Sequence, residues 1–341
     1  MSHYASRLRT ASALSVVAIL AGCGIDRDSS KALGQAGQTT TQALVDQETL
    51  AATRLGSIPV WNPVSETLLC SNHTPALQET CVKLVKQSAK TDAQDGTNAD
   101  IGKIGTVIAR RAAATQALRN AYAAFVDMAT YDASAEAKAS IQAAADSLDQ
   151  LSTAVSAFAG PVPLIAGEVT VILGDVGGFV VGERQRVLLL QASKALHKAC
   201  DTFAKDLSLE RDFVTGRLMG VLQSHVSRAY VAFIQAGLVS PGEVLTPLLQ
   251  TVAPGTAIVE KPPEANAQTI RAAALLYAEK NAEVAANQAV NSYDKAVAAL
   301  NALSQQHQNL ENGASIDTAG ILALVQLLAT DFRKPTTKPN S

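Results

Sequence analysis

Aromatic side chains are scarce in this 341-residue chain. They make up 4% of the residues, with a single tryptophan. Hydrophobic residues nevertheless reach 48%, and much of that share is alanine. Alanine is the best helix former and takes little space, so helices faced with alanine can pack closely. The composition therefore predicts an all-α fold: an elongated bundle of long, amphipathic, alanine-rich helices that resembles a coiled coil.

Positive charge is not in excess either, because 28 Lys and Arg face 30 Asp and Glu, for a formal net charge of −2. Without a basic surplus we expect no nucleic-acid partner. Catalytic motifs are lacking as well: there is no Gly-x-Ser-x-Gly, phosphate-binding loop, His-Glu-x-x-His or dinucleotide-binding glycine pattern. We therefore expect no enzyme activity and no cofactor, although a site that leaves no motif stays open.

The N-terminus carries the one strong signal. Arg7 and Arg9 precede an uncharged, largely apolar run over residues 10–20, which is too short to remain as a membrane span. A short basic head, an apolar run and a small-residue cleavage site are typical of a secretory signal. The four residues that end it are Leu20-Ala21-Gly22-Cys23.

This tetrapeptide closely resembles the lipobox of bacterial lipoproteins. The resemblance implies that residues 1–22 are a removed signal peptide and that Cys23 carries fatty acids such as palmitate. The alternative is that Cys23 is an ordinary buried cysteine. In enteric lipoproteins, aspartate after the acylated cysteine favours the inner membrane. Gly24 stands there in this chain, so the resemblance favours the periplasmic face of the outer membrane.

The remaining three cysteines do not have the spacing of a zinc site, and the five histidines are scattered. Thr74 and Pro75 predict the start of a helix between Cys70 and Cys81. In an oxidising compartment, a disulfide between these two cysteines would pin the preceding segment to that helix. The alternative is two separate buried thiols. We expect Cys200 to be a buried free thiol.

Residues 23–42 are rich in glycine, serine, threonine and glutamine, and such a composition cannot bury enough surface to fold alone. We therefore predict a flexible tether over 23–42, a helical body over 43–333 and a disordered tail over 334–341.

Apolar residues recur at helical spacing throughout the body. After a short helix that Pro59 and Pro63 would break, this spacing predicts helices over about 104–130, 134–159, 183–236, 241–252 and 264–312. A last helix is predicted to begin at Ser315 or Asp317 and to include Leu328. Gly237 and Gly313 are predicted to end two of these helices, and Ser240 and Glu243 to form a capping box at the start of another.

Residues 161–182 contain only two charged side chains, Glu168 and Asp175. In one helix, glycines spaced four apart would share a face and let another backbone come close; here they are Gly174, Gly178 and Gly182. We expect a buried hairpin between two long helices. The alternative is a membrane-active segment, similar to the apolar hairpins of helical pore-forming toxins, although its two charges are costly in lipid.

Together these features favour a membrane-anchored periplasmic lipoprotein with a non-catalytic helical body that is a binding or structural component of the cell envelope. Its expected partners are the lipid membrane, through Cys23, and an envelope protein. The alternative is a membrane-active, pore-former-like protein that inserts residues 161–182. An enzyme whose site leaves no motif is the third class.

Overall fold

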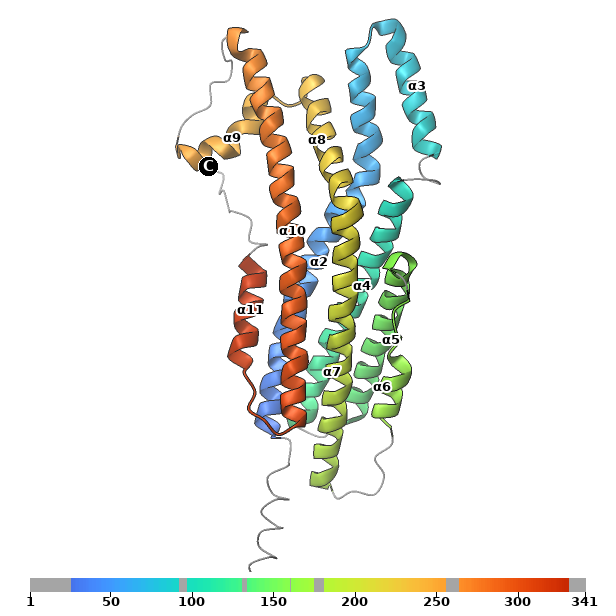
Figure 1. The fold of residues 1–341 in the computed structure, drawn as a ribbon, viewed down its shortest axis with the longest axis vertical. Coiled ribbons are helices and arrows are strands. Elements are labelled where there is room, and N and C mark those ends of the chain that lie inside the picture. Colours follow the sequence, from blue (N-terminus) through green and yellow to red (C-terminus); the bar gives the residue numbers. More distant parts are fainter. Residues whose placement is uncertain are drawn as a thin grey trace, which may run out of the picture. The chain divides into compact units, whose positions relative to one another are not determined.

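The computed structural model describes residues 26–91, 97–130, 134–159, 161–174, 181–255 and 264–330. All regular secondary structure in these ranges is helical, which confirms the all-α prediction (Figure 1). The helices are α2 (Arg27–Leu69), α3 (Pro75–Thr91), α4 (Thr97–Thr130), α5 (Ser134–Ala159), α6 (Ala166–Ile172), α7 (Val181–Phe213), α8 (Met219–Gln235), α9 (Pro241–Val252), α10 (Ala267–Glu311) and α11 (Thr318–Thr330). Three short turns, η1 (Cys70–Asn72), η2 (Val214–Leu218) and η3 (Glu264–Asn266), precede α3, α8 and α10.

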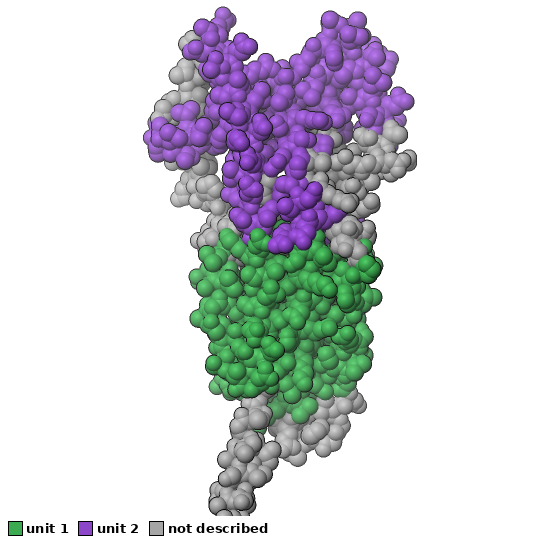
Figure 2. Space-filling view, in the orientation of Figure 1, with its two compact units in different colours: residues 1–49, 109–209, 293–341 green, residues 50–108, 210–292 purple. Residues whose placement is uncertain are grey.

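The chain forms two compact units rather than the single body expected over 43–333 (Figure 2). Unit 1 comprises residues 1–49, 109–209 and 293–341, and unit 2 comprises residues 50–108 and 210–292. Helices α2, α4, α7 and α10 each contribute residues to both units.

Unit 1 is a helical bundle with a core rich in small side chains. The distance between two packed helices depends on the side chains at their contact, and alanine permits a short one. Alanines from four of its helices are fully buried; they include Ala114, Ala121, Ala144, Ala195 and Ala299. Larger side chains, such as Phe125 and Phe203, fill the remaining space. The low aromatic content therefore suits this kind of packing.

Unit 2 contains smaller hydrophobic clusters. One joins Ile104 and Ile108 of α4 to Val214, with Phe213 and Met219 packed against it. A second joins Ile234 of α8, Val244 of α9, and Ala274 and Ala278 of α10. Helices α7 and α8, expected as one helix over 183–236, are separated by the π-helical turn η2.

The tether expected over residues 23–42 is wrong from Arg27 onward, because this stretch is the first part of α2. Asp26 caps the helix: its carboxylate accepts the backbone N–H of Ser29 at 3.0 Å and the Ser29 hydroxyl at 2.7 Å. Leu33 and Thr40 are fully buried within unit 1. Composition misled here because small and polar residues serve close helix packing in this segment.

Two glycines on α2 show how close that packing is. A Cβ built on Gly34 would lie 2.5 Å from Cγ2 of Val126, and one built on Gly37 would lie 2.2 Å from the ring of Tyr122. Both contacts are to α4. Any side chain at Gly34 or Gly37 would therefore push α2 away from α4.

The helix break expected at Pro59 and Pro63 is also wrong, since α2 continues to Leu69. A proline lacks its N–H and so removes a backbone hydrogen bond, but helical turns on both sides can hold the chain in place. The turn after Pro63 also has a side-chain bond, because the Thr67 hydroxyl donates to the Pro63 carbonyl at 2.8 Å.

The predicted helix ends are confirmed. Gly237 and Gly313 follow α8 and α10 with φ of 70° and 67°, a conformation that favours glycine. The Ser240 hydroxyl accepts the backbone N–H of Glu243 at 3.2 Å, and the Glu243 carboxylate accepts the backbone N–H of Ser240 at 3.0 Å. This is the capping box that the sequence predicts at the start of α9.

Candidate functional site

Several predicted features lie outside the described residues. They include the signal peptide over 1–22, the acylation site Cys23, Gly178 and the tail over 334–341. Lipid attachment at Cys23 therefore stays a prediction.

Cys70 and Cys81 are joined in a disulfide, with their Cα atoms 5.7 Å apart, and Cys200 is a free, buried thiol. The disulfide connects the turn after α2 to the second turn of α3. None of the described side chains of α3 from Pro75 to Lys90 is fully buried. The covalent link therefore holds a helix that has little core of its own.

The glycine pattern at 174, 178 and 182 does not line one helix. Helix α6 has seven residues and gives way to Leu173, so Gly174 lies beyond it, while Gly182 belongs to α7. Gly178 lies outside the described residues. Among the described residues, a Cβ on Gly174 would meet only the Val171 carbonyl of its own turn, at 3.1 Å. No backbone of another described element therefore approaches Gly174 in the way that the sequence predicts.

The described part of this segment, residues 161–174, is bound to α5, and Glu168 also forms an ion pair with Lys198 of α7 at 2.8 Å. The Asp149 carboxylate accepts the backbone N–H groups of Ile165 and Ala166 at 2.6 and 3.1 Å. The buried side comprises Val162, Ile165, Val169 and Leu173. Leu164 and Val171, by contrast, are 56% and 80% exposed. The expected burial is thus half right, because the short helix is amphipathic.

The core of unit 1 contains a hydrogen-bonded polar cluster that sequence reasoning missed. The His307 ring bonds through Nε2 to the Tyr122 hydroxyl at 3.0 Å and through Nδ1 to the Ser193 hydroxyl at 2.9 Å. The Tyr122 hydroxyl also lies 3.1 Å from Sγ of Cys200. Ser193 and His307 are 114 positions apart in the chain, so no local motif could have indicated the contact.

Burial controls the protonation of this cluster. It lowers the pKa of His307 to about 3, helped by the charge of nearby His197, so the imidazole is neutral at pH 7. It also raises the pKa of Cys200 to about 12 and that of Tyr122 well above its ordinary value. A serine beside a neutral histidine suggests a nucleophile and its base. All four side chains are fully buried, however, and a substrate has no access to them.

A second buried contact joins α4 to α10. The Arg111 guanidinium donates to the Tyr293 hydroxyl at 3.0 Å and lies 5.3 Å from the centre of its ring. Nearby in unit 1, the Ser152 hydroxyl donates to the Asp206 carboxylate at 2.7 Å. These hydrogen bonds satisfy polar groups inside the bundle. They connect helices rather than forming an open site.

His197 of α7 lies closer to the surface, with Nδ1 3.3 Å from the Glu311 carboxylate and Nε2 3.5 Å from that of Asp201. Within the described ranges, no group of three or more histidine, cysteine, aspartate or glutamate residues has an arrangement that could hold a metal ion.

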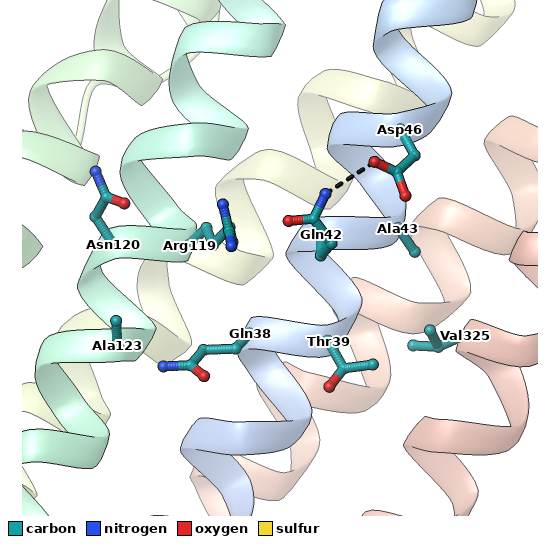
Figure 3. A pocket seen from close by; sticks show the side chains of 9 residues that line it. All are labelled: Gln38, Thr39, Gln42, Ala43, Asp46, Arg119, Asn120, Ala123 and Val325. Carbon is teal, nitrogen blue, oxygen red and sulfur yellow. Dashed lines mark hydrogen bonds between the residues drawn. The ribbon is translucent and has the colours of Figure 1, made fainter.

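An open groove of about 590 Å³ lies on unit 1 between α2 and α4, with one residue from α11 (Figure 3). Helix α2 supplies Gln38, Thr39, Gln42, Ala43 and Asp46; helix α4 supplies Arg119, Asn120 and Ala123; helix α11 supplies Val325. Most of these side chains carry polar groups that can donate or accept hydrogen bonds. The groove can therefore bind a polar ligand, but it contains no nucleophile paired with a base.

No protein-family model, curated protein or solved structure matches the chain. None of the helices in the described ranges has the length and apolar character needed to cross a membrane.

Proposed function

We propose that the protein is a lipoprotein anchored through acylated Cys23, with a non-catalytic helical body on the periplasmic side that binds an envelope protein or braces the envelope. The tetrapeptide Leu20-Ala21-Gly22-Cys23, behind a short basic and apolar leader, carries this proposal. Several acyl chains on one cysteine would give lasting attachment, whereas a single chain binds a membrane only reversibly. Gly24 favours the outer membrane.

The start of α2 supports this proposal. Cleavage before Cys23 would leave α2, which begins at Arg27, intact. Only residues 24–26 would then separate the acylated cysteine from the helix, and Asp26 is already its cap. The anchor would therefore hold unit 1 close to the bilayer. The proposal includes an elongated, coiled-coil-like, alanine-rich body, and small-angle X-ray scattering tests whether the body is elongated.

A binding or structural role accounts for the polar groups better than catalysis does. Ser193 and His307 are enclosed in the core and bonded to each other. The accessible polar groups line the groove between α2 and α4, where Arg119 and the glutamines can bind a partner without reacting with it.

Labelled palmitate tests the anchor in cells. Wild-type protein is expected to incorporate the label, and Cys23→Ala is expected to remain unlabelled and uncleaved. Cys200→Ala is the matched control, because it also removes one thiol but leaves the lipobox intact, and it should be labelled like the wild type. Label on Cys23→Ala would contradict the proposal.

The exposed side chains of Leu164 and Val171 favour one alternative, a body that inserts residues 161–182 into a membrane. Insertion would require the bonds from Asp149 to the start of α6 to break. We expect liposomes to stay intact with the wild-type protein. Leakage that disappears when residues 161–182 are deleted would support the alternative instead.

A further inference from the structure

The groove on unit 1 begins on α2 directly after Gly34 and Gly37, the two glycines that pack against α4. At Gly34 and Gly37, α2 approaches Val126 and Tyr122 so closely that no side chain fits between the helices. From Gln38 onward the groove-lining positions of α2 include two glutamines, Gln38 and Gln42, one helical turn apart. The same close contact that fixes the two helices thus determines where the opening starts.

The groove walls offer hydrogen-bonding groups that no other side chain in the described ranges uses. Arg119 is exposed, and it forms no hydrogen bond or ion pair with any residue in the described part of the chain. The same holds for the amide of Gln38. Gln42 donates its amide N–H to the Asp46 carboxylate at 2.8 Å, which leaves the Gln42 carbonyl as an acceptor (Figure 3).

This set of groups matches a peptide. A peptide backbone presents N–H donors and C=O acceptors in alternation, and a glutamine side chain can bond to both. An arginine guanidinium binds a carboxylate through two parallel hydrogen bonds. More of the exposed groove surface is apolar than polar, and Ala43, Ala123 and Val325 contribute apolar surface for an aliphatic side chain. No aromatic ring is among the described lining residues to stack on a sugar.

We propose that the groove between α2 and α4 binds an extended peptide segment of a partner protein, with one carboxylate of that segment against Arg119. This inference deepens the proposed binding role and rests on it. Asp46 adds a second element of specificity. Gln42 orients the Asp46 carboxylate, and both residues lie on α2, whereas Arg119 lies on α4. The negative charge of Asp46 therefore disfavours a second acidic side chain beside it in the bound peptide.

The test uses the mature acylated protein in detergent and a library of hexapeptides with acetylated and amidated ends. Three pools carry glutamate, glutamine or lysine at a fixed central position and uncharged residues elsewhere. We expect the glutamate pool to be retained about tenfold better than the lysine pool, a difference of about 1.4 kcal/mol. Arg119→Gln should abolish this preference, and Gln42→Ala should weaken retention of every pool.

Arg110→Gln is the matched control, because Arg110 is also an exposed arginine on α4 but bonds to Gln150 instead of lining the groove. It should bind like the wild type. Retention of no pool, or equal effects of Arg119→Gln and Arg110→Gln, would overturn the inference. The inference would also be overturned if a tetramer of N-acetylglucosamine bound in an Arg119-dependent way while no peptide pool was preferred. Mass spectrometry of Cys23 in the same sample separates the two proposals: an acylated protein without peptide preference contradicts only the groove.

Discussion

Gly37 lies so close to Tyr122 that a Cβ on Gly37 would be 2.2 Å from two carbons of the tyrosine ring. The ring has little freedom to move, because its hydroxyl bonds to His307 and contacts Cys200 in the core. This contact makes the beginning of α2 part of the folded body. It also joins the helix that follows the proposed lipid anchor to the central polar cluster.

Gly37→Ala should therefore destabilise the protein. Overpacking of a core typically costs about 1–3 kcal/mol. Thermal unfolding followed by circular dichroism should show a lower melting temperature. Gly105→Ala is the control, because Gly105 also lies within a helix but has open space around it. There the substitution should be neutral or stabilise by up to about 1 kcal/mol. Equal melting temperatures for the two variants would contradict the close packing of α2 on α4.

His307 should make stability fall in acid. Its pKa is about 3 in the folded protein, against 6.5 for a free histidine, so only the unfolded chain takes up this proton between those values. The contribution of neutral His307 is complete above pH 6.5 and is lost as the pH falls towards 3. Between these pH values the free energy of unfolding falls by up to about 1.4 kcal/mol per pH unit.

Urea unfolding at pH 7, 6, 5 and 4 measures this dependence. His307→Gln is the comparison, since an amide can still bond to Tyr122 and Ser193 but does not titrate. The free energy of unfolding of the variant should fall less steeply than that of the wild type. Parallel pH profiles would show that His307 is not held neutral in the core.

The cysteines should differ in reactivity. Burial raises the pKa of Cys200 to about 12, so its thiol stays protonated and enclosed. Iodoacetamide should leave Cys200 unmodified in the native protein and label it after unfolding. Peptide mapping without reduction should recover Cys70 and Cys81 as one linked pair. Rapid labelling of Cys200 in the native state would contradict its burial.

Loss of the disulfide should release α3. Closing a loop of this length contributes about 3 kcal/mol in the chain-entropy model, and α3 has no fully buried side chain to compensate between Pro75 and Lys90. Cys81→Ser should therefore expose α3 to proteolysis before the rest of the protein. Val252→Ser, an equally mild change at an exposed site, is the control. Unchanged cleavage of α3 in Cys81→Ser would show that other contacts hold this helix.

Asp149 should determine whether α6 stays in place. Its carboxylate accepts two backbone N–H groups at the start of α6. Asp149→Ala should speed amide hydrogen exchange at Ile165 and Ala166, while Glu136→Ala, at an exposed site on the same helix, should not. Slow exchange at both amides in Asp149→Ala would contradict this role.

Features set by neighbouring residues could be predicted from the sequence. Gly237, the capping box of Ser240 and Glu243, and the pairing of Cys70 with Cys81 depend on short-range geometry, and each is confirmed. The beginning of α2 could not be predicted in this way. Its glycines and threonines suggest flexibility when taken alone, and only the contact with α4 explains them.

The polar sites were beyond prediction for a related reason. The bond between Ser193 and His307 joins positions 114 residues apart, and neither residue belongs to a motif. The groove takes Gln38, Arg119 and Val325 from three separate helices. The regular spacing from Gly174 to Gly182 led to a wrong prediction for a different reason. It has meaning only within one continuous helix, and the chain forms no such helix there.

Intact mass spectrometry of the protein extracted from membranes tests the central proposal most directly. The account predicts a mature chain that begins at Cys23, with acyl chains on that residue and residues 1–22 removed. A chain that retains residues 1–22, or a mature chain with an unmodified Cys23, would contradict it.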